Sequence, residues 1–262
     1  MPMAARWNGR YIGVGNGSWG GSFNYERLDE ALTAGYATSS TDTGHHGAPR
    51  DKSWANGHPE KQVDFDYRAT HETAETAKAV IRRYYGREVS SSFFNGCSNG
   101  GRQGLMEAER YPGDYDGILS GAPALQWGFD TFVRGDLRAF EQRGGKVVIY
   151  HGGADRPETS TRFFADLRSS MGDSAVRGFL QLYVIPGMRH CGGGVTPNDV
   201  GQTVRANDDA DHSLFRALER WVEQGIRPEG VTASTFRVED DPSSGAVRTR
   251  RLRPYSPLPK KR

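Results

Sequence analysis

Short apolar segments rich in β-branched and aromatic residues alternate along this chain with longer segments of helical period. The short segments are bounded by turn-forming residues, which is typical of β-strands. Strands that alternate with helices favour parallel βαβ units, so we expect an α/β fold with a mostly parallel sheet covered by helices. The predicted strands span residues 10–17, 35–40, 89–96, 117–123, 146–152 and 179–187, and the predicted helices span 67–85, 99–111, 135–143, 158–171 and 211–224.

The length and charge of the chain limit its organisation and its partners. A chain of 262 residues fits one large α/β domain, which we place at 1–250, followed by a basic, proline-containing tail at 251–262. The net charge of +2 gives no reason to expect nucleic acid or an anionic membrane as a partner, and the basic tail is interpreted as solubilising. No apolar run approaches the ~20 residues of a membrane span. The N-terminus lacks the apolar core of a signal peptide, so we expect none in this chain.

One serine stands in a motif typical of enzyme nucleophiles. The segment GCSNG, residues 96–100, matches the G-x-S-x-G pattern and lies between a predicted strand and a predicted helix. Because such a motif is weak evidence in a chain with 34 glycines, it needs partners. Asp155 and His190 each follow a later predicted strand, in the chain order Ser, Asp, His of α/β-hydrolases. Parallel strands end at one edge of a sheet, so we predict Ser98 as nucleophile, His190 as base and Asp155 as the acid that orients it.

The same arrangement requires groups that stabilise negative charge on the substrate. We expect one oxyanion-hole donor to be the backbone N–H of Asn99, and the other to be that of Gly17 or Ser18 in the glycine-rich loop 13–21. The remaining histidines are interpreted as structural or solvated. No His/Cys spacing resembles a zinc site, and the glycine-rich loop lacks the Lys-Ser/Thr ending of a phosphate loop. We therefore expect no metal and no cofactor.

The only two cysteines, Cys97 and Cys191, each adjoin a predicted catalytic residue. If Ser98 and His190 share a hydrogen bond, these neighbours come close in space. A disulfide requires Cα atoms roughly 4.4–6.8 Å apart, which such a site allows. The alternative is two unrelated buried thiols. We favour the bridge, because chance would rarely place both cysteines beside this one serine–histidine pair.

These residues resemble the tannase and feruloyl esterase family, which includes mono(2-hydroxyethyl) terephthalate hydrolases. The resemblance covers nearly the whole chain and is carried by segments such as GCSNGGRQGLMEAERYPGDYDGILSGAPA, RGGKVVIYHGGAD and IPGMRHCGGG. It implies an α/β-hydrolase fold, a catalytic triad of Ser98, Asp155 and His190, and a disulfide between Cys97 and Cys191. It also implies a secreted or periplasmic enzyme that acts on feruloyl, galloyl or terephthaloyl esters.

The chain departs from the family pattern where the substrate would bind. Family members usually insert a lid domain, often with a calcium-binding loop, after the segment GAPA. Here GAPALQWGFDTFVRGDLRAFEQRGGK leads almost directly into the next predicted strand, so we expect no lid, no metal and an open cleft. Gly153 and Arg253 stand where the family commonly has tryptophan and cysteine. Trp19 and Trp127 remain as candidates to stack on an aromatic acyl ring.

The sequence therefore predicts a serine carboxylic ester hydrolase that forms an acyl-Ser98 intermediate on small or polymer-linked aromatic esters. Two alternatives stay open. One is a non-catalytic binding module on a hydrolase scaffold. The other is an acyltransferase that uses the same triad, in which an alcohol outcompetes water. The sequence gives no oligomeric state.

Overall fold

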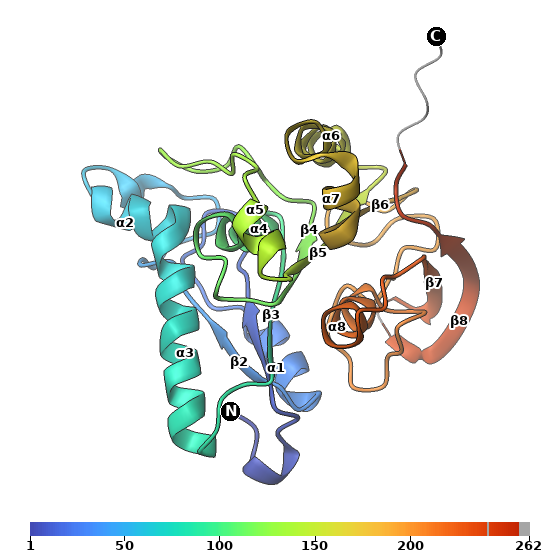
Figure 1. Ribbon diagram of the computed structural model, residues 1–262, viewed down its shortest axis with the longest axis horizontal. Helices are drawn as coiled ribbons and strands as arrows, with labels where there is room; N and C mark the ends of the chain where they lie inside the picture. Colours follow the sequence, from blue (N-terminus) through green and yellow to red (C-terminus); the bar gives the residue numbers. More distant parts are fainter. Residues whose placement is uncertain (240, 257–262) are drawn as a thin grey trace.

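Six parallel strands form the central sheet of the computed structural model, which describes residues 1–239 and 241–256. The strand order is β2-β1-β3-β4-β5-β6 (Figure 1). This sheet confirms the expected α/β class, and each of its strands overlaps one of the predicted strands. The bounds are Arg10–Val14 for β1, Ala37–Ser40 for β2, Ser91–Cys97 for β3, Gly117–Gly121 for β4, Lys146–Gly152 for β5 and Leu180–Ile185 for β6.

Helices cover both faces of the sheet. One face packs against α3 to α7, and the other packs against α1, α8 and a C-terminal hairpin. Within the described part of the chain, no helix is long and apolar enough to cross a membrane. The helices are α1 (Tyr25–Thr33), α2 (Pro59–Val63), α3 (Ala69–Tyr85), α4 (Asn99–Arg110), α5 (Arg138–Gln142), α6 (Glu158–Met171), α7 (Asp173–Phe179) and α8 (Leu214–Gln224), with 3-10 turns at Ala4–Arg6 and Ser53–Ala55 and a π turn at Asp64–Arg68.

The central strands are apolar on both sides because each side meets a layer of helices. Phe94 and Ile118 pack into the cluster beneath α3 to α7, whereas their neighbours Phe93 and Leu119 pack into the cluster beneath α8. Successive side chains of a strand point to opposite faces, so a sheet buried on both faces needs continuous apolar runs. These runs are the signal that made the strands predictable.

The strand order reverses between β1 and β3. The chain runs from β1 outward to β2, and then returns to pair β3 with the other side of β1. The loops that follow β1 and β3 therefore leave in different directions. In open α/β sheets this reversal leaves a crevice at the carboxyl ends of the strands, where ligands bind.

An antiparallel hairpin of β7 (Val231–Val238) and β8 (Asp241–Leu252) closes the described chain. Arg251 and Leu252, which the sequence analysis placed in the tail, pair with Thr232 and Val231 and so belong to β8. Residues 257–262 of the predicted tail lie outside the described residues.

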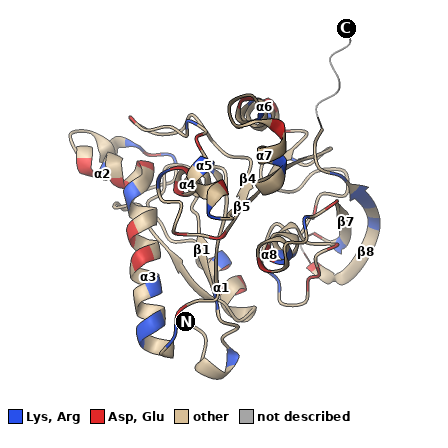
Figure 2. Ribbon diagram, viewed as in Figure 1, with Lys and Arg blue, Asp and Glu red and all other residues tan. Residues whose placement is uncertain are grey.

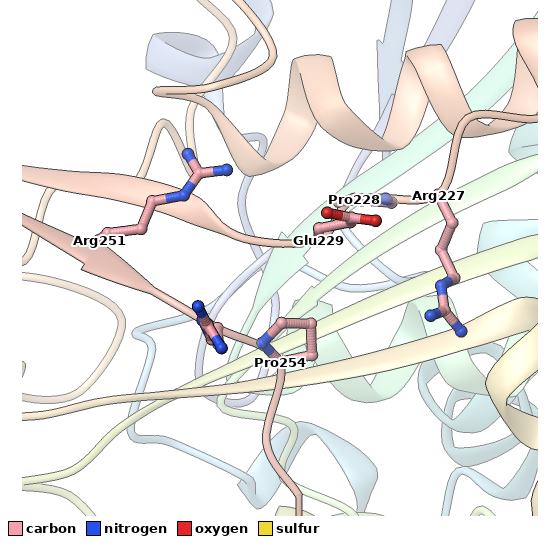
Figure 3. A pocket seen from close by; sticks show the side chains of 6 residues that line it. Arg227, Pro228, Glu229, Arg251 and Pro254 are labelled. Carbon is pink, nitrogen blue, oxygen red and sulfur yellow. The ribbon is translucent and has the colours of Figure 1, made fainter.

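Basic side chains gather on this hairpin. Figure 2 shows blue segments on β8. Arg248, Arg250 and Arg251 of this strand are exposed. Beside them a hollow of about 430 Å³ contains no predicted catalytic residue (Figure 3). Two of its arginines, Arg227 and Arg251, donate hydrogen bonds to main-chain oxygens. The hollow is lined by Arg227, Pro228, Glu229, Arg251, Arg253 and Pro254.

Candidate active site

Ser98 occupies a sharp turn between β3 and α4. Its backbone has φ of 62° and ψ of −119°, a conformation that non-glycine residues rarely adopt. The turn is fixed to the end of β4, because the Ser98 N–H donates to the Gly121 carbonyl over 2.9 Å and the Ala124 N–H donates to the Ser98 carbonyl over 3.1 Å. Strain of this kind persists where surrounding structure imposes it, and it is common at functional sites.

Close backbone contacts around this turn exclude side chains. A Cβ on Gly96 would lie 2.6 Å from the backbone of Gly100, and a Cβ on Gly101 would lie 2.3 Å from the Gly121 carbonyl oxygen. Neither neighbour is a flexible side chain, so neither contact can be relieved cheaply. Gly96, in the G-x-S-x-G segment, and Gly101, directly after it, therefore have a steric role at the turn.

The loop after β1 is bonded to the first turn of α4. The Asn16 side-chain oxygen accepts hydrogen bonds from Asn99 Nδ2 and Gln103 Nε2, both over 3.0 Å. In the described chain, the backbone N–H groups of Gly17, Ser18 and Asn99 donate to no other protein group. The residues predicted to form the oxyanion hole thus come from two segments that one asparagine ties together.

Asp155 and His190 form a hydrogen-bonded pair above the ends of β5 and β6. His190 Nδ1 lies 2.6 Å from Asp155 Oδ2, and a carboxylate can only accept, so Nδ1 carries the hydrogen. Burial would raise the pKa of Asp155, but its hydrogen bonds with His190 and His151 and the charge of His190 outweigh this effect and hold that pKa below its ordinary value. The carboxylate therefore stays ionised and orients the ring.

The predicted disulfide between Cys97 and Cys191 is present, with Cα atoms 5.9 Å apart. It joins the last residue of β3 to the residue after His190. Gly152 brings the end of β5 against the same histidine loop, because a Cβ there would lie 2.3 Å from the Arg189 carbonyl oxygen. The loop that carries His190 is thus held from two sides.

Ser98, Asp155 and His190 all line one cleft of about 1370 Å³. Within the described residues no hydrogen bond joins Ser98 to His190. Such contacts often form only with substrate present, so this geometry is compatible with a serine–histidine pair. Other lining side chains include Leu125, Trp127, Phe132, Arg134, Arg156 and Phe163.

The two predicted aromatic residues differ in their placement. Trp127 lines the cleft with 38% of its surface exposed. Trp19 is not among the described lining residues. It packs against Trp127, with ring centroids 4.6 Å apart, and against Phe65 and Phe129. Trp19 therefore supports the aromatic wall that Trp127 presents.

Two carboxylates anchor the segment between β4 and α5 that carries this wall. Buried Asp66 accepts three hydrogen bonds of 3.0 Å from the backbone N–H groups of residues 129–131. Glu109 of α4 accepts two of 2.8 Å from the N–H groups of Arg134 and Gly135. The residues between these anchors are Phe132 and Val133. Asp66 thus fixes an irregular segment, since residues 129–131 belong to no helix or strand.

A buried arginine links this segment to the turn at Ser98. Arg102 of α4 is fully buried, and it donates to Asn99 Oδ1 and to the carbonyl oxygens of Asp66 and Phe65 over 2.8–2.9 Å. Burial lowers the pKa of Arg102 to about 10, which leaves it charged at neutral pH. The helix that carries Ser98 at its start therefore also fixes the aromatic wall.

Sequence reasoning interpreted His151 as structural, but it contacts Asp155. His151 Nε2 lies 3.1 Å from Asp155 Oδ2, the oxygen that also binds His190. The signal was available in the spacing, since His151 stands four residues before Asp155 at the end of β5. It was missed because a histidine before a glycine turn is more often structural.

A second histidine–carboxylate cluster lies away from the cleft. His71 Nδ1 of α3 lies 2.7 Å from Asp114 Oδ2, and buried Glu107 of α4 completes the group. Their donor atoms lie within 4.8 Å of one another, a spacing that would also suit a metal ion. His71 Nδ1 and Asp114 Oδ2 are, however, already hydrogen-bonded to each other.

Comparison with known proteins places this site in a family. The chain matches the family described as tannase and feruloyl esterase over residues 1–135 and 129–262. A mono(2-hydroxyethyl) terephthalate hydrolase of Piscinibacter sakaiensis is 39% identical over 139 residues, which cover 48% of this chain and 23% of that protein. A probable feruloyl esterase of Arthroderma benhamiae is 42% identical over 136 residues, which cover 48% of this chain and 25% of that protein. The chain thus spans about a quarter of the length of these curated relatives.

Solved structures share the fold over almost the whole chain. Feruloyl esterase B from Aspergillus oryzae superposes with a TM-score of 0.87 at 19% identity, covering 96% of this chain and 81% of that one. A tannin acyl hydrolase from Aspergillus niger superposes with a TM-score of 0.81 at 16% identity, covering 97% and 79%. The matched residues include Ser98, Asp155, His190 and both cysteines. The chain belongs to the tannase and feruloyl esterase family, with an α/β-hydrolase fold.

Proposed function

We propose that this protein is a serine carboxylic ester hydrolase that acts on esters of aromatic acids. One observation carries the proposal: the strained turn at Ser98 and the His190–Asp155 pair open into the same cleft, and a disulfide joins the residues next to Ser98 and His190. Relatives named as feruloyl esterase and terephthalate-ester hydrolase support the reaction class.

In the proposed reaction the Ser98 hydroxyl attacks the ester carbonyl while His190 Nε2 takes its proton. Asp155 keeps the Nδ1–H tautomer of His190 and stabilises the imidazolium that forms. The oxyanion is bound by the N–H of Asn99 and that of Gly17 or Ser18. His190 then gives the proton to the departing alcohol. In the second half of the reaction His190 takes a proton from a water molecule, which attacks acyl-Ser98, and returns that proton to the Ser98 oxygen as the acid leaves.

The acyl group is proposed to be aromatic, of the feruloyl, galloyl or terephthaloyl type. Trp127 and Phe132 present exposed aromatic surface in the cleft, at 38% and 41% exposure. The connection from β4 to β5 holds only the short helix α5, so no lid domain covers the cleft from that segment. We therefore expect broad tolerance, including bulky or polymer-linked esters.

The proposed location is outside the cytosol. The Cys97–Cys191 disulfide is the reason, since such bonds persist in oxidising compartments and are rare where thiols are kept reduced.

The test is hydrolysis of a panel of small and bulky aromatic esters by the purified protein and by Ser98→Ala. The alanine variant should lose about 10⁴-fold or more in kcat, because removing the nucleophile of a triad has effects of this order. A serine-directed phosphonate should label Ser98 alone, as judged by peptide mass spectrometry. An alanine variant with the activity of the parent would overturn the assignment.

The same panel separates the two other functions. A binding module would hold the esters without turnover in either form. An acyltransferase would give mainly transesterified product when a second alcohol is added, whereas a hydrolase continues to release the free acid. We expect release of the acid.

A further inference from the structure

Asp155 is held by two histidines at the same oxygen. His190 Nδ1 lies 2.6 Å from Asp155 Oδ2, and His151 Nε2 lies 3.1 Å from it. The two rings come from different places, His190 from the loop after β6 and His151 from the end of β5. The carboxylate is therefore fixed against the sheet as well as against the ring that it orients.

The other nitrogen of His151 is also bonded. His151 Nδ1 lies 2.7 Å from the hydroxyl of Ser160 in α6, and both residues are buried. A carboxylate can only accept, so His151 Nε2 carries the hydrogen, and Nδ1 then accepts from the Ser160 hydroxyl. The surroundings thus select a single tautomer of a neutral ring.

Burial keeps this ring neutral. Removal from water lowers the pKa of His151, although the charge and hydrogen bond of Asp155 oppose the change. The other charged or titratable groups that act on it are His190 and Glu158. A neutral His151 donates to Asp155 without adding a positive charge beside His190, so it can hold the carboxylate without repelling the imidazolium that forms during catalysis.

We propose that His151 is a positioning residue, which fixes the Asp155 carboxylate through a Ser160–His151–Asp155 hydrogen-bond chain. This inference rests on the proposed function, because it assigns Asp155 the task of orienting a catalytic His190. Without the second donor, the carboxylate is free to turn about its side-chain bonds. The charge of the Asp155 carboxylate would then interact with His190 alone instead of with both histidines.

The test compares His151→Leu with His151→Gln. Leucine removes the donor, whereas the glutamine amide can donate to Asp155 from about the place of Nε2. We expect His151→Leu to lower kcat by ~10–100-fold, by analogy with the loss of outer hydrogen-bond partners from metal-binding histidines. KM should change much less. His151→Gln should recover most of the loss, and Ser160→Ala should show a smaller loss because the ring remains.

The pH dependence of kcat tests the positioning role, because a purely structural role of His151 would leave it unchanged. In His151→Leu the undivided charge of Asp155 should favour the protonated His190, so the acid limb of the pH–kcat profile should move to higher pH. Histidine NMR should show the same movement of the His190 titration midpoint, and this measurement requires no catalysis. The matched control is His71→Leu, which breaks the other buried histidine–aspartate pair and should leave the limb in place.

The outcomes separate this inference from the proposed function. If Ser98→Ala is as active as the parent, the esterase assignment fails, yet the NMR comparison still reports whether His151 acts on the Asp155–His190 pair. If folded His151→Leu keeps the parent kcat and pH limb, or if folded His151→Gln loses as much as leucine does, the positioning role is wrong. Should the leucine variant not fold, Ser160→Ala and His151→Gln decide the question.

Discussion

Two histidine–aspartate pairs in this protein have nearly the same geometry and different surroundings. His190 lies 2.6 Å from Asp155, and His71 lies 2.7 Å from Asp114. The His190 side chain is 53% exposed and lines the cleft, whereas His71 is stacked on Tyr111 with ring centroids 3.8 Å apart. A histidine–carboxylate bond therefore indicates no function by itself. What distinguishes the first pair is an open cleft and a strained serine.

The carboxylates of the two regions also differ in how they are satisfied. Asp155 accepts hydrogen bonds from two histidines, and its pKa is held below the ordinary value. Burial, with the adjacent Asp114, raises the pKa of Glu107 well above its ordinary value. Both side-chain oxygens of Glu107 are buried, close to the carboxylate of Asp114. Asp155 therefore stays ionised beside the cleft, whereas Glu107 stays protonated within the core.

The largest expected difference between the two pairs is in catalysis. His190→Ala should lower kcat by about 10⁴-fold or more, because it removes the base of the proposed triad. His71→Ala should leave kcat within about twofold of the parent and lower the stability instead by about 1–3 kcal/mol, since it leaves buried Asp114 without its donor. Steady-state kinetics and urea unfolding of both variants measure the contrast. Equal losses of kcat would show that the two pairs do not differ as described.

The second expected difference concerns the covalent link, which only the cleft region has among the described residues. The disulfide closes a sequence separation of 94 residues, for which the chain-entropy estimate is about 4.5 kcal/mol. The double variant Cys97→Ser, Cys191→Ser should lose stability of this order and should also lose kcat, because the His190 loop is freed. Histidine NMR should show the His71 environment unchanged in the folded variant. A double variant as stable as the parent would show that the disulfide does not stabilise the protein.

The disulfide and the proposed catalytic residues could be predicted from the sequence because they form local patterns. The G-x-S-x-G segment, the order of Asp155 and His190, and the two cysteines beside them can be read from the chain, and the disulfide is confirmed. The buried strands were predictable for a similar reason, since continuous apolar runs mark a sheet covered on both faces.

The parts that the sequence did not predict depend on contacts between distant segments. Asp66 acts through residues 129–131, which only the fold brings near. His151 is the exception, because its partner Asp155 stands only four residues away. The hairpin of β7 and β8 was missed because the arginine-rich β8 lacks apolar alternation and is held by backbone pairing. Helix α1 was missed because it is short and mostly polar.

The smallest expected difference is in the pH dependence of stability. The folded-state pKa of Glu107 is raised, so its contribution is fully present below the unfolded pKa of about 4.3 and is lost as the pH rises toward the folded value. Glu107→Gln does not titrate. Its stability relative to the parent should therefore increase with pH above about 4.3, by up to ~1.4 kcal/mol per pH unit until the folded pKa is reached.

Urea unfolding at pH 5 and pH 8 measures this difference. The matched control is Glu75→Gln, on the exposed side of α3, which should show no such trend. A Glu107→Gln variant that loses stability relative to the parent as the pH rises would mean that the folded protein holds Glu107 as an anion. The contrast with Asp155 would then disappear.

The two anchors of the segment between β4 and α5 make that segment suitable for replacement by other sequences. Asp66 holds residues 129–131 and Glu109 holds Arg134 and Gly135, so the positions of both ends are set by groups outside the segment itself. Lengthening a surface loop between fixed ends costs little, about 0.6 kcal/mol for each doubling. New sequence grafted between Thr131 and Arg134 would thus start from ends that the rest of the fold already holds. Because Arg102 ties the first anchor to the helix of Ser98, such a graft would also begin at a fixed position relative to the proposed nucleophile.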